Sequence, residues 1–122
     1  MLNALAWFEI PATDIVRARR FYETIFAFEM TQFEAAGLQM ALFPAEGSGG
    51  ALCQNATWYK PSAEMGPLVY LNAQPDLAIV LARVEAAGGK VTVPKRQISP
   101  EHGYMAVFVD SEGNRVALHS TK

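Results

Sequence analysis

The feature that most restricts the fold of this chain is an internal duplication. QMALFPAEGSGGALCQ (39–54) can be laid over YMAVFVDSEGNRVALHS (104–120) with a small gap, and ALCQ then matches ALHS. WFEIPATDI (7–15) likewise matches LVYLNAQPDL (68–77), with one extra residue in the second copy. Two copies of a unit of this size exclude a solenoid of many repeats. The chain is therefore expected to build two similar modules.

The first copy shows the pattern of a strand, a helix and three further strands. LAWFEIPA (5–12) alternates as a strand does and meets a proline. Residues 13–26 carry apolar side chains at helical spacing, and Thr13 and Asp14 are available to cap that helix. Three short β-like runs follow, separated by turn residues at Gly37 and 47–50, and they cover 28–34, 38–43 and 50–54.

The second copy repeats this order. A strand is predicted over 67–73 and a helix over 76–87, which ends at Gly88-Gly89. Three strands then follow, within KVTVPKRQI, GYMAVFVD and NRVALHS. A chain of 122 residues is long enough for one domain with a real core. We therefore predict an α+β fold: a single domain, 1–122, made of two βαβββ modules at about 1–57 and 66–122.

Composition and charge exclude several classes of protein. A hydrophobic content of 51% is that of a globular chain, and a net charge of −2 offers no electrostatic reason to bind nucleic acid or an anionic membrane. The single cysteine, Cys53, excludes an internal disulfide and a thiolate metal cluster, and it fits a reducing compartment. No apolar run is long enough to span a membrane, and no signal peptide is evident. A cytoplasmic protein is expected.

The duplicated unit resembles the vicinal oxygen chelate superfamily, which includes glyoxalase I, bleomycin-resistance proteins and extradiol dioxygenases. The resemblance covers essentially the whole chain and is carried by FEIPATDIVRARRFYETIFAFEM (8–30), ARVEAAGGKV (82–91) and HGYMAVFVDSEGNRVALHS (102–120). Within this superfamily the chain looks like the small glyoxalase-related proteins. The resemblance implies curved sheets that form a cleft, a helix on the outer face of each sheet, and pairing of two chains into a homodimer.

The resemblance also locates the positions at which a metal would be held. In members that use metal, the first and fourth strands of each module supply ligands with carboxylate, amide or imidazole side chains. The matching positions here are Trp7, Ala51, Leu68 and Ala117. None of these side chains can bind a divalent ion, because such ions need imidazole, carboxylate, thiolate or carbonyl donors. We therefore expect no metal and no other cofactor.

The chemistry-bearing side chains stand two residues beyond those four positions. Glu9, Cys53, Tyr70 and His119 should share the cleft face with them, because strand side chains alternate between faces. Together with Trp7 they are the predicted ligand-binding residues, and Glu9 and His119 are the predicted catalytic ones. A displaced metal site formed by Glu9, Cys53 and His119 would need compact geometry, which nothing in the sequence indicates.

Each candidate also has a purely structural interpretation. Glu9 is a carboxylate on an apolar strand, so it contacts His119 or Tyr70, or else accepts a hydrogen bond from a ligand. His119 either bonds a neighbour or serves as a ligand contact or acid/base group. Trp7 is either a cleft wall suited to an aromatic ligand or part of the core. Cys53 is expected to be a small buried hydrophobe, and a loop histidine, His102, to face solvent.

These observations favour a metal-free protein that binds an apolar or aromatic small molecule. The first alternative is a metal-independent isomerase or lyase in which Glu9 or His119 transfers a proton. The second is a metal-dependent glyoxalase or dioxygenase, which the family suggests and the four matching side chains oppose.

Overall fold

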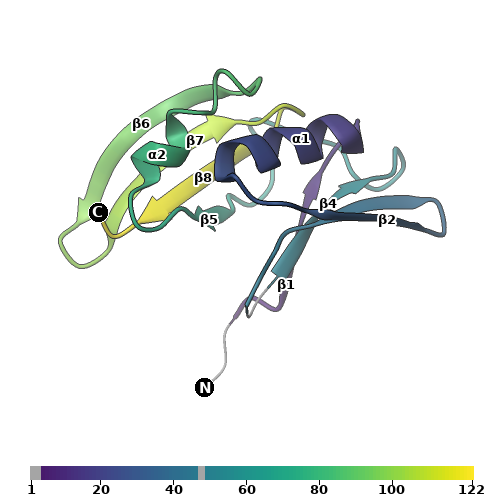
Figure 1. Ribbon diagram of the computed structural model, residues 1–122, viewed down its shortest axis with the longest axis horizontal. Coiled ribbons are helices and arrows are strands. Elements are labelled where there is room, and N and C mark those ends of the chain that lie inside the picture. Colours follow the sequence, from purple (N-terminus) through teal and green to yellow (C-terminus); the bar gives the residue numbers. More distant parts are fainter. Residues whose placement is uncertain (1–3, 47–48) are drawn as a thin grey trace.

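The computed structural model describes residues 4–46 and 49–122, and it forms two four-stranded sheets with two helices (Figure 1). The first sheet has the order β1-β4-β3-β2 and the second has the order β5-β8-β7-β6. The elements of the first module are β1 (Trp7–Pro11), α1 (Ile15–Phe26), β2 (Thr31–Ala35), β3 (Leu38–Leu42) and β4 (Gly49–Gln54). Those of the second are β5 (Tyr70–Asn72), α2 (Leu77–Leu81), β6 (Lys90–Ser99), β7 (Gly103–Val109) and β8 (Arg115–Ser120). This confirms the predicted α+β fold with two βαβββ modules.

The strand registers of the two modules correspond to one another. The first strand of each module pairs in parallel with the fourth, and the other pairs are antiparallel. Glu9 lies opposite Ala51 in the first sheet, and Tyr70 lies opposite Ala117 in the second. Glu9 and Tyr70 are therefore equivalent positions, as the duplication in the sequence predicted.

Helix α1 forms where the apolar spacing predicted it. Its buried side chains are those of Ile15, Ala18, Phe21, Tyr22 and Ile25. Asp14 is the N-cap, and its side chain accepts a hydrogen bond from the backbone N–H of Arg17, which satisfies a donor that the helix leaves free. Ala27, in the left-handed region at φ 56°, ends the helix.

Helix α2 is shorter than predicted. The sequence pattern indicated a helix over 76–87, but the regular helix ends at Leu81. Beyond it the backbone bonds tighten, since Arg83 N–H donates to the Val80 carbonyl and Val84 N–H to the Leu81 carbonyl, three residues apart. Val84 is fully buried in this segment, so the apolar spacing is satisfied although the regular helix has ended.

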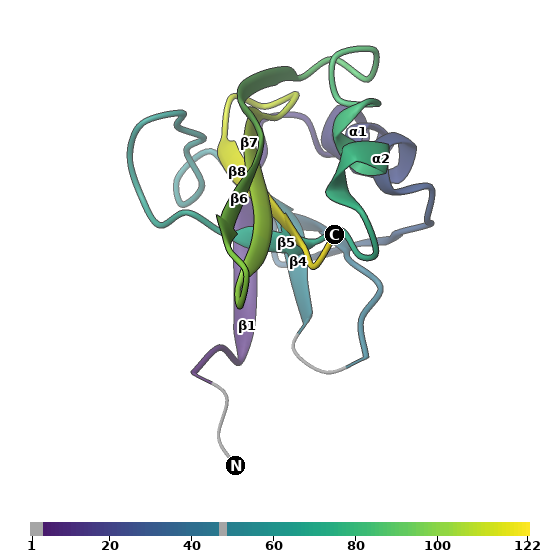
Figure 2. The same cartoon turned by 90° about the vertical axis from the view of Figure 1, so that its left-hand side faces the viewer.

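Helix α1 packs against both modules. The rings of Phe21 and Tyr22 contact Phe108 of β7, with centroids 5.8 and 6.4 Å away. Figures 1 and 2 show α1 and α2 on the same side of the molecule, and the two helices contact each other. The side chains that face the helices form one core cluster shared by both sheets. A separate small cluster, Met105, Val107 and Ala117, lies on the face of the second sheet turned away from the helices. We call that side of each sheet its helix-free face.

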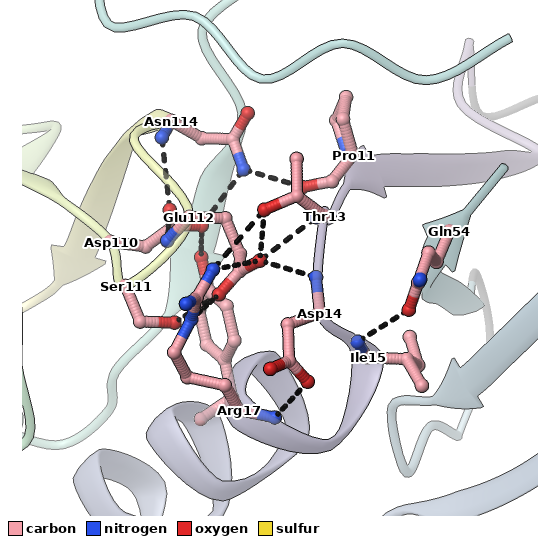
Figure 3. Close-up of polar contacts among 11 residues, drawn as sticks. Pro11, Thr13, Asp14, Ile15, Arg17, Gln54, Asp110, Ser111, Glu112 and Asn114 are labelled. Carbon is pink, nitrogen blue, oxygen red and sulfur yellow. Dashed lines mark hydrogen bonds and ion pairs between the residues drawn. The ribbon is translucent and has the colours of Figure 1, made fainter. Parts of the chain in front are cut away.

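Buried polar residues of the turn between β7 and β8 join the second module to the first (Figure 3). The Glu112 side chain has no exposed area. Its carboxylate accepts hydrogen bonds from the backbone N–H groups of Thr13 and Asp14, both at 2.8 Å, and from Arg17 Nε at 2.7 Å. Arg17 remains half-exposed, with 52% of its side chain accessible, while Glu112 ties the turn between β7 and β8 to the start of α1.

Asp110 and Asn114 complete this connection, which we call the inter-module clamp (Asp110, Glu112 and Asn114). The Tyr22 hydroxyl donates to Asp110 Oδ2 at 2.7 Å, and Asn114 Nδ2 donates to the Pro11 carbonyl at 2.7 Å. Burial raises the pKa of Asp110, although hydrogen bonds from Asn114 and Tyr22 oppose the rise. For Glu112, burial also opposes ionisation, but the hydrogen bonds from Arg17, Asp14 and Thr13 lower its pKa to about 2.

Candidate functional site

Glu9 is held by two aromatic hydrogen-bond donors. It lies on the first strand, opposite the buried Ala51. Trp7 Nε1 donates to Glu9 Oε2 at 3.2 Å, and the Tyr59 hydroxyl donates to Glu9 Oε1 at 2.5 Å. Both contacts are exposed. The carboxylate is thus satisfied without the His119 or Tyr70 contact that the structural interpretation had offered.

Tyr59 is a site residue that the sequence analysis did not identify. The segment after β4 folds back because the Asn55 carbonyl accepts from the backbone N–H groups of Trp58 and Tyr59. The Asn55 side chain also accepts from the N–H of Thr57, at 3.0 Å, which is the Asx-turn geometry common after strands. An Asn directly after a strand was a signal for this turn, but nothing in the sequence connected Tyr59 with Glu9, 50 residues away.

Cys53 lies beside Glu9 and is fully buried. Burial, reinforced by the Glu9 carboxylate, raises the pKa of the Cys53 thiol to about 12. A nucleophilic or metal-binding cysteine must be a thiolate near neutral pH. Cys53 is therefore a neutral side chain in this structure, in keeping with its predicted role as a small buried hydrophobe.

The other two predicted site residues lie on the second sheet, apart from Glu9. Tyr70 is 49% exposed, opposite Ala117. His119 Nε2 lies 2.6 Å from the carbonyl oxygen of His102, to which it donates because a carbonyl can only accept. His102 itself is exposed, as predicted. His119 thus bonds a neighbouring residue, as its purely structural interpretation predicted, and its Nε2 is engaged in that hydrogen bond.

The donor set at the chelate positions does not fit a metal ion. The side chains at these positions, those of Trp7, Leu68 and the buried Ala51 and Ala117, have no atom that can coordinate a metal ion. Over residues 4–46 and 49–122, no group of three or more His, Cys, Asp or Glu side chains is arranged to hold a metal. A displaced site of Glu9, Cys53 and His119 would also need a thiolate, which the raised pKa of Cys53 opposes.

Two cavities of about 420 Å³ each lie between the modules and divide the predicted site residues. Trp7 and Glu9 line the first cavity, together with Lys60 and Arg115. Tyr70 lines the second cavity, whose wall also includes four phenylalanines: Phe8, Phe26, Phe28 and Phe43. Cys53 and His119 are not on the wall of either one. The structure therefore brings Trp7, Glu9 and Cys53 together and leaves Tyr70 and His119 elsewhere.

Comparisons with known proteins agree with this architecture. The family model described as the Glyoxalase/Bleomycin resistance protein/Dioxygenase superfamily matches residues 4–118. No protein of curated function matches the sequence. In the part of the chain that the structure describes, no helix is long and apolar enough to cross a membrane.

Solved structures with the same fold have little sequence in common with this chain. A glyoxylase/bleomycin resistance protein/dioxygenase domain from Frankia sp. EAN1pec has a TM-score of 0.73 at 15% identity, with 100% of both chains covered. A glyoxalase/bleomycin resistance protein/dioxygenase family enzyme from Burkholderia phytofirmans PsJN has a TM-score of 0.71 at 15% identity, with 96% of this chain and 98% of that chain covered. Glyoxalase I from Zea mays has a TM-score of 0.71 at 16% identity, and the match covers 95% of this chain but only 45% of that one. At such identities the likeness shows the fold alone.

Proposed function

The chain belongs to the Glyoxalase/Bleomycin resistance protein/Dioxygenase superfamily, and we propose that it is a metal-free small-molecule binding protein, because no side chain at the chelate positions can coordinate a metal ion. The observation that carries the proposal is the set of side chains at those positions, since tryptophan, leucine and alanine cannot coordinate a divalent ion. A fold that builds a cavity without the chelating groups retains the capacity to bind.

The first cavity is the proposed binding site. Its volume of about 420 Å³ lies within the range of about 300–1,000 Å³ typical of small-molecule pockets. Trp7 is 44% exposed there and offers a flat apolar surface to an apolar or aromatic ligand. Its hydrogen bond to Glu9 holds the indole in place, so little ordering is needed when a ligand binds. Glu9 supplies an acceptor for a polar group.

Tryptophan fluorescence tests this proposal directly. The chain has two tryptophans, so Trp58→Phe leaves Trp7 as the only one. Trp58 is 80% exposed, and its replacement should leave the fold intact. We expect apolar and aromatic compounds to change the Trp7 emission saturably, with the same affinity in EDTA as without it. Binding that EDTA abolishes and a divalent ion restores would contradict the proposal.

A second candidate function is a metal-independent isomerase or lyase. Glu9 favours it, because this carboxylate is exposed at a cavity and has a phenol hydroxyl, that of Tyr59, within hydrogen-bond distance. His119 is the weaker proton-transfer group, since its Nε2 donates to the His102 carbonyl. Once a substrate is found, Glu9→Gln should retain binding but lose turnover. Unchanged turnover after replacement of both Glu9 and His119 would exclude this function.

We also propose that the chain forms a homodimer. The apolar cluster on the helix-free face of the second sheet is separate from the main core, and Trp7, Phe33 and Tyr70 are large exposed apolar side chains. Exposed surface of this kind favours association. Light scattering should give twice the mass of one chain, and a monomer at micromolar concentration would contradict it. We propose further that the chain is cytoplasmic, because the free, buried thiol of Cys53 is compatible with a reducing compartment.

A further inference from the structure

Arg115 lines the first cavity with a guanidinium that has no ion pair among the described residues. It begins β8, and its Nη2 donates to the Gly66 carbonyl at 2.9 Å. Its Nε is buried and has no acceptor among the described residues. None of the ion pairs found within residues 4–46 and 49–122 includes Arg115. A guanidinium that lines a cavity and has no counter-charge among the described residues would be stabilised by an anion bound in that cavity.

The charged groups around the first cavity favour an anionic ligand. Two of the lining side chains are cationic, Lys60 and Arg115, and one is anionic, Glu9. Glu9 already accepts hydrogen bonds from Trp7 and Tyr59, whereas Arg115 has only the neutral Gly66 carbonyl. Neither the Arg115 guanidinium nor the Lys60 ammonium has a carboxylate partner among the described residues, so both favour an anionic ligand in this cavity.

Most of the remaining wall is apolar. The apolar lining includes Met65, Val69 and Val116, which lie near Lys60 or Arg115 in the sequence. It also includes Leu5, Trp7 and Phe8 of the first module. A small inorganic anion would leave this apolar surface uncovered. A ligand with an apolar body would cover it and remove it from water, which is favourable.

We propose that the ligand of the first cavity is an amphipathic carboxylate, whose carboxylate is bound by Arg115 and whose apolar body packs against Trp7. This inference rests on the proposed metal-free binding function and adds the chemical class of the ligand. A planar guanidinium recognises a carboxylate through two parallel hydrogen bonds, which a lysine cannot reproduce. Arg115 is thus the specificity-determining residue of the site.

A matched pair of ligands tests the assignment. In the Trp58→Phe protein, dissociation constants for 2-naphthoate and for its neutral counterpart 2-naphthylmethanol are measured from Trp7 emission. We expect the acid to bind at least about tenfold more tightly than the alcohol, because the alcohol cannot form the charge-assisted interaction with Arg115. Arg115→Gln should weaken binding of the acid by about tenfold and leave the alcohol unchanged. Arg96→Gln is the control, because Arg96 is exposed on β6 and outside the cavity wall.

The outcomes separate this inference from the proposed function. Equal binding of acid and alcohol overturns the carboxylate assignment and leaves metal-free binding of apolar ligands intact. An acid preference that persists in Arg115→Gln also overturns it. Failure of both compounds to bind at millimolar concentration counts against the binding function as well. If thermal melts show that Arg115→Gln is unfolded, Arg115→Lys replaces it. The preference for the acid over the alcohol should then decrease, and an undiminished preference overturns the assignment.

Discussion

The two modules share one order of elements but place their polar groups in different locations. In the first module the distinctive acid is Glu9, exposed on the first strand and bonded to Trp7 and Tyr59. The equivalent position of the second module is Tyr70, which has no such partner set among the described residues. The acids that distinguish the second module, Asp110 and Glu112, are instead buried at its β7–β8 turn.

This difference indicates that the two copies of a duplicated unit can have different roles in one protein. The strand pairing of Glu9 with Ala51 and of Tyr70 with Ala117 is the same, so the backbone register was retained in both copies. The side chains that differ between the copies are those on sheet faces and in turns, where a change does not alter the pairing of the strands. The first module carries a polar group at a cavity, and the second carries the clamp that joins the modules.

Replacing the acid of the clamp should have the largest effect. Glu112→Ala leaves the backbone N–H groups of Thr13 and Asp14 and the Arg17 guanidinium without their shared acceptor. We expect a loss of about 3 kcal/mol in the free energy of unfolding, measured by urea denaturation. Glu101→Ala, at an exposed turn position, is the matched control and should change it by less than about 0.5 kcal/mol. Similar losses in both variants would mean that the clamp does not join the modules.

The clamp should also make stability depend on pH in acid. The pKa of Glu112 is lowered from 4.5 to about 2, so the stability it contributes is present above its unfolded pKa and is lost as pH falls toward its folded pKa. The raised pKa of Asp110 acts in the opposite sense, contributing stability below its unfolded pKa that is lost as pH rises through its folded pKa.

The variant Glu112→Gln isolates the first of these contributions. The difference in unfolding free energy between wild type and variant should narrow as pH falls from about 4.5 toward about 2. Urea denaturation at a series of pH values measures this difference. A difference in unfolding free energy that stays constant over that range would show that Glu112 is not held ionised by its neighbours.

A smaller effect is expected at Tyr22, where the clamp reaches the core. Tyr22→Phe removes the 2.7 Å hydrogen bond to Asp110 and leaves the second donor, Asn114 Nδ2, in place. The expected loss is about 1–2 kcal/mol by thermal or urea unfolding. Tyr70→Phe changes the same atom at an exposed position and should be neutral. Equal effects at the two tyrosines would contradict the distinction between a buried and an exposed polar group.

The smallest effect should be that of the Glu9 charge on the rate at which the Cys53 thiol is alkylated. The pKa of the thiol is about 12, and burial is the leading cause. Iodoacetamide should therefore alkylate Cys53 slowly in the native protein and rapidly in urea, as followed by mass spectrometry. Glu9→Gln should leave native alkylation slow, because burial remains. Rapid native alkylation of that variant would mean that Glu9, and not burial, protects the thiol.

The sequence predicted the features that depend on local period and on the duplication. Helix α1, the order of elements along each module and the equivalence of Glu9 with Tyr70 all follow from them. Contacts between side chains far apart in the chain could not be predicted in this way. The Tyr59–Glu9 bond spans 50 residues and the Glu112–Thr13 bond spans 99. The early end of α2 escaped prediction because a tighter turn buries Val84 with the same apolar spacing.

Metal analysis of protein purified without a histidine tag tests the central claim most directly. Metal content is measured by mass spectrometry, and melting temperatures are compared with and without added Zn²⁺, Ni²⁺, Mn²⁺ and Fe²⁺. A metal that binds only the folded state must raise the melting temperature by mass action. The proposed metal-free function predicts far less than one metal ion per chain and no shift. A stoichiometric metal that is lost in His119→Ala would contradict it and would place a chelate site further along the strands than the family positions.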